Sequence, residues 1–336
     1  MKKGFTLIEL LGIIVILGLI VAFTVPSLIN LKKNEEQKEY DNFLKNVSLA
    51  AETFYQTNTK MCDFDNYTYC YINVNDLIEN DYLRNDLINP KNKNVISHLD
   101  TVILEKNEDN TIKYYYSSMN EYVQNNLLVH YDGINNIITK HDNSTNVWKT
   151  IKGNLDGNIN GATWNNNSLM FDGNSYVSID QINTQNITYE AVFNSTEPSE
   201  YVPLIANVEG GGCTLSTRHS PYRAYGQCYI NGQYRTLNTS TLEDNKDYLV
   251  TMTFDGTTLK LYLNGSFITE YVDSTNSGIS YPISDTIVML GANPVGNKPQ
   301  CCYYSGKIYS VRIYDRALSE SEVKQNYEVD KSRYNL

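Results

Sequence analysis

Residues 1–23 read MKKGFTLIELLGIIVILGLIVAF, an apolar stretch that follows two lysines and contains a single ionisable residue, Glu9. The run from Phe5 to Phe23 is about long enough to span a bilayer, and the lysines favour the cytoplasmic side for the residues before it. A carboxylate in an apolar helix costs roughly 2.5 to 3.5 kcal/mol on insertion scales, so Glu9 needs a partner. Cleavage after Gly4 would create a cationic α-amino group at Phe5 that could pair with Glu9 of a neighbouring subunit. The stretch therefore predicts a single-pass protein of the cytoplasmic membrane whose subunits assemble.

Residues 2–17, KKGFTLIELLGIIVIL, closely resemble the amino-terminal signal of type IV prepilins and of the pseudopilins of secretion and competence systems. The resemblance implies that a prepilin peptidase cleaves after Gly4 and that Phe5 becomes the methylated terminus. It also implies that Glu9 guides docking onto other pilin subunits, that the precursor contacts membrane lipid, and that the processed chain joins an extracellular filament or the cell surface. An ordinary secretory signal would need an A-x-A cleavage site, which this stretch lacks. A plain transmembrane anchor would leave Glu9 and the Gly-Phe junction unexplained.

A helical pattern continues beyond the apolar run, and we expect one helix over residues 5–60. Pro26 removes a hydrogen-bond donor and should bend this helix rather than end it. Apolar residues then recur at steps of three and one, which places them on one face of the helix: Tyr40, Phe43, Leu44, Val47, Ala50, Ala51 and Phe54. The helix is longer than a bilayer requires, so its outer half should belong to a globular head.

The head is expected over residues 61–126. A short helix is predicted at residues 74–83, and residues 98–118 read as two strands joined by a polar turn at Asp109 and Asn110. Together with the long helix, these elements predict an α+β pilin module with a small antiparallel sheet, preceded by a leader at residues 1–4.

Residues 127–336 change to short β-rich runs separated by turns, and they predict an all-β jelly-roll sandwich. The runs are residues 168–173, 176–179, 187–194, 213–218, 248–254, 259–265, 266–272, 287–292 and 307–315. Pairs that tolerate positive φ mark the turns: Asn231-Gly232, Asp255-Gly256 and Asn264-Gly265. A final helix should begin with a capping box between Ser319 and Glu322, and Leu318 should pack onto Val323.

Several motifs of this half, among them SLMFDGNSYVSI and SGKIYSVRIYDRALSESEVKQNY, resemble the laminin-G-like, concanavalin-like lectin family in the family's order. The resemblance implies a jelly roll that binds a glycan, a protein or no known ligand. Members of the family often bind calcium, although none is required here, and Thr150 and Lys152 stand where an acidic turn is common. Asp172 and Asp255, which precede glycines, are more typical of turns than of calcium ligands.

The six cysteines admit fifteen pairings. Cys62 and Cys70 could close a small loop in an oxidising compartment, and Cys213 and Cys228 flank a predicted hairpin. The remaining cysteines, Cys301 and Cys302, are adjacent in the sequence. The pairing of the four cysteines in the second half, which are Cys213, Cys228, Cys301 and Cys302, stays open at this point. The spacing lacks the C-x-x-C pattern of a zinc site.

The formal charge of −11 argues against direct nucleic-acid binding, although Arg218, Arg223 and Arg235 occur close together. Glu190 is the one prominent carboxylate on a predicted strand, and no second carboxylate accompanies it as a glycosidase would need. The histidines, namely His98, His130, His141 and His219, show no metal spacing. Tyrosines near loops could stack on a sugar or simply fill half-buried strands: Tyr222, Tyr225, Tyr229, Tyr303 and Tyr304.

These patterns predict a minor type IV pilin, not an enzyme, whose lectin-like domain adheres to a glycan or a surface protein. The alternatives are a pseudopilin of a type II secretion or DNA-uptake machine and, less favoured, an anchored glycan hydrolase. The ligand-binding residues are not identified by the sequence.

Overall fold

The computed structural model describes residues 7–65, 67–134, 146–195, 201–208, 211–283, 285–334 and 336. Gly4, Phe5 and His141 lie outside the described residues, and so do the side chains of Glu9 and Pro26. Cleavage, methylation, docking and the helix kink therefore stay predictions. The chain forms two compact units, one of residues 1–98 with 104–116 and one of residues 99–103 with 117–336.

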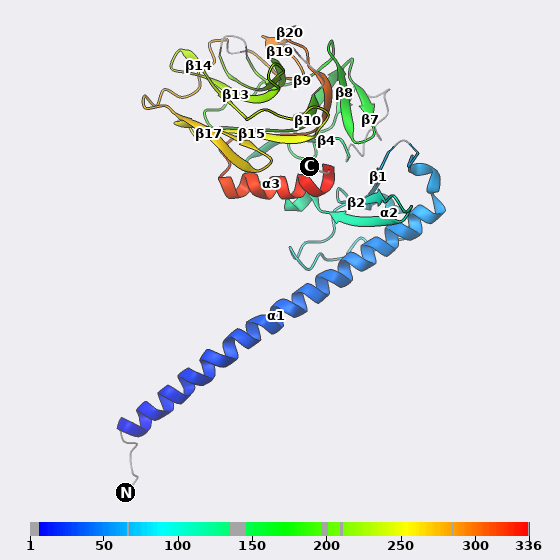
Figure 1. Ribbon diagram of the computed structural model, residues 1–336, viewed down its shortest axis with the longest axis vertical. Helices are drawn as coiled ribbons and strands as arrows, with labels where there is room; N and C mark the ends of the chain where they lie inside the picture. Colours follow the sequence, from blue (N-terminus) through cyan, green and yellow to red (C-terminus); the bar gives the residue numbers. More distant parts are fainter. Residues whose placement is uncertain are drawn as a thin grey trace. The chain divides into compact units, whose positions relative to one another are not determined.

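The first unit is built on α1, which runs from Leu7 to Thr57 and is continuous in Figure 1. The helix does not end at Pro26. The predicted apolar face is confirmed, because its buried residues recur at helical spacing: Phe43, Val47, Ala50, Ala51 and Phe54. Tyr40 and Leu44 border them and are half-buried.

The expected single-pass location in the cytoplasmic membrane is wrong. Among the residues that the structure describes, no helix combines the length and the apolar character that a crossing of the bilayer requires.

The rest of the first unit is a small head. Its elements are η1 (Thr59–Met61), β1 (Tyr69–Asn73), α2 (Val74–Glu79), β2 (Thr101–Lys106) and β3 (Ile112–Ser117), and the sheet has the order β1-β2-β3. The predicted turn joins β2 to β3, with Asn110 at a φ of 64°. Cys62 and Cys70 form a disulfide with an S–S distance of 2.01 Å. The expected pilin-like module of a long helix and a small antiparallel sheet is confirmed.

The second unit is a sandwich of two sheets. The first, called here the β10 sheet, has the order β17-β16-β15-β10-β21-β8-β7, with β4 also paired to β21. Its strands are β4 (Leu127–Asp132), β7 (Thr163–Asn165), β8 (Ser168–Asp172), β10 (Ile187–Ser195), β15 (Tyr248–Phe254), β16 (Thr258–Leu263), β17 (Ser266–Val272) and β21 (Ser305–Tyr314). All pairings within it are antiparallel.

The second sheet, called here the β12 sheet, has the order β14-β13-β12-β11-β18-β9-β6-β5. Its strands are β5 (Val147–Trp148), β6 (Gly157–Asn160), β9 (Tyr176–Ile179), β11 (Val202–Ala206), β12 (Cys213–Arg218), β13 (Arg223–Ile230), β14 (Gln233–Asn238) and β18 (Val288–Leu290). A separate hairpin is formed by β19 (Asn293–Val295) and β20 (Lys298–Cys301). The predicted all-β sandwich is confirmed.

The core of the sandwich lies between the two sheets, because each strand alternates apolar residues toward it. Phe193 and Met252 come from the β10 sheet, whereas Leu215 comes from the β12 sheet, and all are fully buried. The predicted turns close hairpins as expected, with Asn231 and Asn264 at φ angles of 51° and 48°.

The C-terminal helix α3 runs from Glu320 to Tyr334 and lies against the β10 sheet, where it contacts β15 and β17 (Figure 1). The predicted capping box is present: the Ser319 amide donates to Glu322 Oε2 at 2.8 Å, and the Glu322 amide donates to Ser319 Oγ at 3.4 Å. Leu318 and Val323 share one buried cluster, as the sequence predicted. A short 3₁₀ turn, η2 (Met119–Glu121), precedes β4.

Candidate functional site

The face of the β12 sheet that points away from the core carries polar and aromatic side chains. On β12, Cys213 and Leu215 enter the core, so the residues between and beyond them point the other way. The cross-strand registers carry this alternation onto the neighbouring strands. The resulting surface, called here the outer face, is formed by Thr214, Ser216, Arg218, Arg223, Tyr225, Gln227, Tyr229, Tyr234, Thr236 and Asn238.

Cross-strand pairs organise the outer face. Gln227 lies opposite Thr236, and its Nε2 donates to Thr236 Oγ1 at 2.7 Å. Tyr229 lies opposite Tyr234, and their ring centroids are 4.9 Å apart. Such pairs stabilise adjacent strands and fix the directions of their side chains.

Tyr201 flanks the outer face from the residue before β11. Its ring centroid is 4.8 Å from that of Tyr225, with the two planes at 70°. The Arg218 guanidinium lies over the Tyr201 ring at 5.1 Å, a cation–π contact. Tyr201 remains 44% exposed, so its ring is available to a ligand.

A cavity of about 90 Å³ opens on the outer face, and a larger hollow of about 450 Å³ lies at the tip of the β12–β13 hairpin. The smaller cavity is lined by Tyr201, Pro203, Val208, Thr214, Ser216, Gln227, Tyr234 and Asn293. The larger is lined by His219, Ser220, Pro221, Tyr222, Thr241, Leu242 and Asp244. The outer face is therefore hollowed between aromatic rings and polar groups.

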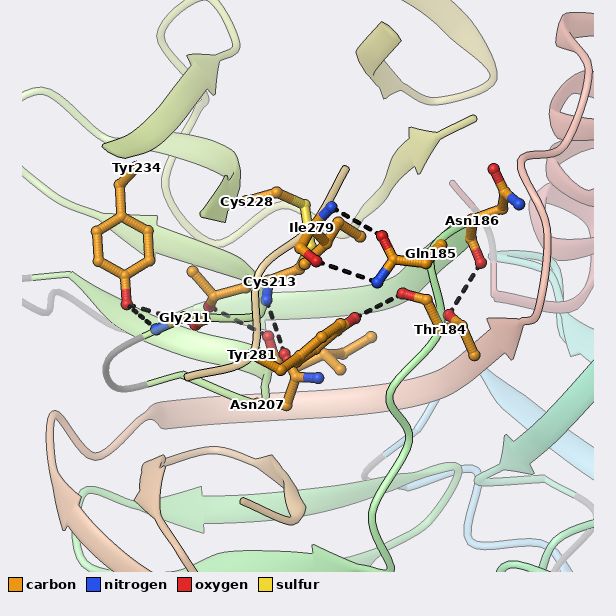
Figure 2. Close-up of a disulfide and its surroundings, with 12 residues drawn as sticks. Thr184, Gln185, Asn186, Asn207, Gly211, Cys213, Cys228, Tyr234, Ile279 and Tyr281 are labelled. Atoms are coloured by element: carbon orange, nitrogen blue, oxygen red, sulfur yellow. Dashed lines mark hydrogen bonds between the residues drawn. A yellow bond between two sulfur atoms is a disulfide. The ribbon is translucent and has the colours of Figure 1, made fainter. Parts of the chain in front are cut away.

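A disulfide fixes the sheet directly beneath this surface (Figure 2). Cys213 and Cys228 are register partners on β12 and β13, their S–S distance is 2.04 Å, and both are fully buried. Asn207 Oδ1 accepts the Cys213 amide at 2.7 Å. On the other side of the loop, the Tyr234 hydroxyl accepts the Gly211 amide at 3.0 Å, which holds one ring of the outer face in place.

The loops around the disulfide are held by side-chain hydrogen bonds to backbone groups (Figure 2). Gln185 Nε2 donates to the Ile279 carbonyl at 3.1 Å and its Oε1 accepts the Ile279 amide at 3.1 Å. The Tyr281 hydroxyl donates to the Thr184 carbonyl at 2.7 Å. These contacts position the backbone behind the outer face.

The arginines that the sequence grouped together do not all share one face. Arg218 and Arg223 are register partners on the outer face. Arg235, in contrast, is the register partner of Cys228 on the core side, and its guanidinium lies 5.0 Å from the Tyr271 ring. Side chains alternate between the two faces of the sheet along β14, so Arg235 points to the face opposite that of Arg218 and Arg223.

Glu190, the prominent strand carboxylate, is a buried structural group. Arg312 Nε donates to Glu190 Oε2 at 2.8 Å, and Asn326 Nδ2 donates to the same oxygen at 2.7 Å. Burial raises the pKa of Glu190, and the adjacent Arg312 guanidinium opposes that shift. Arg312 also pairs with Asp330 of α3, so the carboxylate belongs to an ion-pair network between a sheet and a helix.

The tyrosines and histidines named from the sequence divide between core and surface. Tyr229 is half-buried on the outer face, and Tyr225 points to the same face but is only 8% exposed. Tyr222 and Tyr304 are buried, and Tyr303 is half-buried outside the outer face. His130 is buried beside Tyr122, and His219 stacks on Tyr222 at 4.0 Å. His98 bonds to Asn75 Oδ1 at 2.6 Å in the first unit.

Two tyrosines of this site, Tyr234 on the outer face and Tyr201 beside it, were missed from the sequence. Tyr234 could have been found, because the two-residue Asn231-Gly232 turn places it opposite Tyr229. Tyr201 precedes a strand that no turn pair marks, so its position depends on tertiary structure alone.

Asp172 and Asp255, which were considered as calcium ligands, accept hydrogen bonds from backbone amides of the turns that they begin. Asp172 Oδ1 accepts the Asn174 amide at 3.0 Å. Asp255 Oδ1 accepts the amides of Thr257 and Thr258 at 2.9 and 2.7 Å. Within the described ranges, no three histidine, cysteine or acidic side chains gather as metal ligands would. Calcium binding stays a prediction.

The last two cysteines, Cys301 and Cys302, are bonded to each other next to the β19–β20 hairpin. Cys62–Cys70 and Cys213–Cys228 are the other two disulfides.

Residues 171–324 match the sequence model of the family described as the concanavalin A-like lectin/glucanases superfamily. The chain is also 33% identical, over 65 residues, to the type IV major pilin protein PilA of Myxococcus xanthus (strain DK1622). That similarity covers 19% of this chain and 30% of the length of the pilin. The helix over residues 31–57 fits a pilin-like amino-terminal region.

Solved structures resemble part of the chain at low identity and with TM-scores below 0.5. The binding domain of Paraclostridial Mosquitocidal Protein 1 is 16% identical with a TM-score of 0.46, covering 62% of this chain and 53% of that chain. The binding domain of botulinum neurotoxin serotype D is 14% identical with a TM-score of 0.45 (60% and 51% covered), and Trypanosoma rangeli sialidase is 15% identical with a TM-score of 0.45 (69% and 43% covered). The chain thus combines a pilin-like amino-terminal region with a lectin-like sandwich.

Proposed function

We propose that the protein is a minor pilin-like filament subunit whose C-terminal sandwich binds a glycan or a surface protein. The observation that carries this proposal is the outer face of the β12 sheet. It presents the exposed ring of Tyr201, which contacts the largely buried ring of Tyr225, and the hydrogen-bonded pair of Gln227 and Thr236. Tyr201 and Gln227 also line a cavity of about 90 Å³.

This combination suits a saccharide. The apolar face of a sugar ring packs on an aromatic ring, and its hydroxyls exchange hydrogen bonds with amides and hydroxyls. The disulfide between Cys213 and Cys228 and the bond from Gly211 to Tyr234 keep the surface preorganised. Preorganisation lowers the entropic cost of binding.

The burial and pairing of Glu190 support binding as the activity of the sandwich in preference to catalysis. Glu190 is fully buried and bonded to Arg312, so it is not available to protonate or attack an external substrate. On the outer face, the side chains are amides, hydroxyls, tyrosines and arginines, which recognise polar ligands without acid–base chemistry at neutral pH.

Assembly is proposed to depend on the amino-terminal segment. Prepilin peptidase would cleave after Gly4, Phe5 would be methylated, and Glu9 would pair with the terminal amine of another subunit. A second unit that includes residues 117–336 is large for a densely packed subunit, which supports a sparse position in the filament. Mass analysis of the mature terminus is expected to show methylated Phe5, and Glu9→Leu is expected to prevent incorporation. A mature chain that starts at Met1 would remove the assembly proposal.

The binding proposal is tested with an array of glycans and surface proteins probed with the full chain. We expect selective binding, and we expect Tyr201→Ala to abolish it. Tyr115→Ala is the matched control, because Tyr115 is 42% exposed in the first unit and Tyr201 is 44% exposed. Equal binding by the two variants would contradict the assignment of the outer face, and an array without any ligand would contradict the binding function.

A further inference from the structure

The outer face carries an unusual pair of like charges. Arg218 ends β12 and Arg223 begins β13, and the two residues lie directly opposite each other in the hairpin register. Like charges in this position are destabilising by a fraction of a kcal/mol up to about 1 kcal/mol. A chain with a net charge of −11 has ample acidic residues to neutralise such a pair.

Four of the chain's seven arginines are in fact paired with carboxylates, namely Arg84, Arg312, Arg316 and Arg333. Arg218, Arg223 and Arg235 differ, and of these three only Arg218 and Arg223 lie on the outer face. Among the residues that the structure describes, no carboxylate forms a salt bridge with either guanidinium, and the Nε atoms of both have no hydrogen-bond partner. The contacts they do make are with Asn238 Oδ1, which accepts from Arg223 Nη1 at 2.9 Å, and with the Tyr201 ring.

The pair lies beside the aromatic rings of the outer face. Arg218 stacks over Tyr201, whose ring is 4.8 Å from that of Tyr225. Burial raises the pKa of the Tyr225 hydroxyl, and both guanidiniums act in the opposite direction, so both charges lie close to that hydroxyl. Tyr225 is buried and Tyr201 is 44% exposed, so one ligand could meet the two cations and the Tyr201 ring together.

We propose that the outer face binds a carboxylated saccharide, whose acid group is held by Arg218 and Arg223 while a sugar ring packs on Tyr201. A guanidinium matches the planar geometry of a carboxylate and can bond it through two parallel N–H groups. The bound carboxylate replaces the missing counter-charge, and the neighbouring amides, Gln227 and Asn238, bond sugar hydroxyls. This proposal names the ligand class of the proposed function and rests on it.

The test compares two probes with one carbon skeleton, an oligogalacturonate and its methyl ester, against the immobilised full chain. Esterification removes the charge and keeps the rings. The dissociation constant of the acid is expected to be roughly ten- to hundredfold lower than that of the ester, and the difference should shrink as salt is raised. A second comparison, of the dissociation constants of sialyllactose and lactose, tests the preference for a carboxylate with a different acidic sugar.

The variants Arg218→Gln and Arg223→Gln are expected to lose the preference for the acid while retaining the weaker binding of the ester. Arg235→Gln is the matched control, since this arginine lies on β14 and points to the core side of the same sheet. Tyr201→Ala is expected to weaken both probes. Unfolding midpoints of the arginine variants close to that of the wild type would show that the fold is intact.

The outcomes separate the two proposals. Equal affinity for acid and ester, unchanged by both arginine variants, would overturn the carboxylate site and leave a neutral-glycan lectin standing. Absence of binding to every saccharide would overturn both. Glu197 and Glu200 lie outside the described residues. If Arg218 and Arg223 form ion pairs with them, the wild type would not prefer the acid, and only the Glu197→Gln/Glu200→Gln variant would. That result would also overturn the proposal.

Discussion

Arg312 shows how single residues join elements of the sandwich. This arginine of β21 is almost fully buried, pairs with Glu190 of β10 and Asp330 of α3, and lies 4.6 Å from the Tyr122 ring. A buried ion is tolerated only where partners compensate for its lost hydration. The network therefore fixes α3 in one position on the sheet.

Replacing Arg312 by Met should destabilise the second unit by about 3 to 5 kcal/mol, because Glu190 and Asp330 would remain buried without a cation. Urea unfolding followed by tryptophan fluorescence measures this loss, since the two tryptophans of the chain, Trp148 and Trp164, both lie in the sandwich core. Arg235→Met, which breaks no ion pair, is the control and should cost about 1 kcal/mol or less. Similar losses in the two variants would contradict the role of the network.

His130 predicts a dependence of stability on pH. Burial lowers its pKa to about 3, with Arg312 acting in the same direction and Asp132 opposing it. The unfolded chain takes up the proton at a pH of about 6.5, so between about 6.5 and 3 the unfolded state binds more protons and stability falls as pH falls. The free-energy advantage of the wild type over His130→Gln should shrink from pH 7 to pH 4. A constant difference across that range would show that His130 is not buried in its neutral form.

The individual elements follow local signals in the sequence, and α3 is the clearest case. Ser319 and Glu322 form the capping box, and Arg316 adds two bonds to Glu322, at 2.8 and 2.6 Å. These contacts satisfy amide groups that the first turn of a helix leaves open.

Ser319→Ala should lower the free energy of unfolding by about 1 kcal/mol. Hydrogen bonding from Arg316 lowers the pKa of Glu322 to about 2. A depressed carboxyl pKa stabilises the fold above the unfolded value of about 4.3, and this contribution is lost as pH falls toward 2. Denaturation at pH 7 and pH 2.5 should therefore show a larger cost of Glu322→Gln at the higher pH, because part of the contribution is already lost at pH 2.5. Ser332→Ala, near the other end of the helix, is the control.

The sequence predicted the hairpins and the cap because each depends on a few neighbouring residues. It did not predict the full length of α3, whose buried face carries Asn326, Asp330 and Arg333. These polar residues are buried only because partners on β10, β21 and β4 meet them, and a hydrophobic pattern does not reveal such partners. The outer face was predictable in part for the same reason: a turn fixes Tyr234 opposite Tyr229, but no local signal brings Tyr201 to Tyr225.

At the scale of the whole molecule, the second compact unit includes residues 117–126 besides residues 99–103, whereas the sequence suggested a boundary between residues 126 and 127. The residues in between contact the second unit closely. The Tyr122 hydroxyl donates to Asp330 at 2.7 Å, and the Val123 amide donates to Asn326 at 2.9 Å. Met119 and Tyr122 also share a buried cluster with Val329 of α3.

A fragment of residues 127–336 should therefore be less stable than one of residues 117–336. Loss of the buried Tyr122 ring alone should cost about 3 to 5 kcal/mol, as deletions of large aromatic side chains do. Thermal unfolding of the two fragments, followed by tryptophan fluorescence, measures the difference. The point variant Tyr122→Ala in residues 117–336 should account for most of it, and equal midpoints of the two fragments would contradict the placement of residues 117–126.

The bonds from Tyr122 and Val123 to α3 have a mechanical consequence for a subunit under tension. A load that pulls the chain away at residue 117 reaches these two bonds before it reaches β4. Strand β4 is paired with β21 from Leu127 to Asp132. The bonds to the C-terminal helix therefore bear a load applied at residue 117 before the strand pairing of β4 does. If the sandwich is pulled through the proposed attachment of its first unit, it would stay folded for as long as these two bonds to α3 persist.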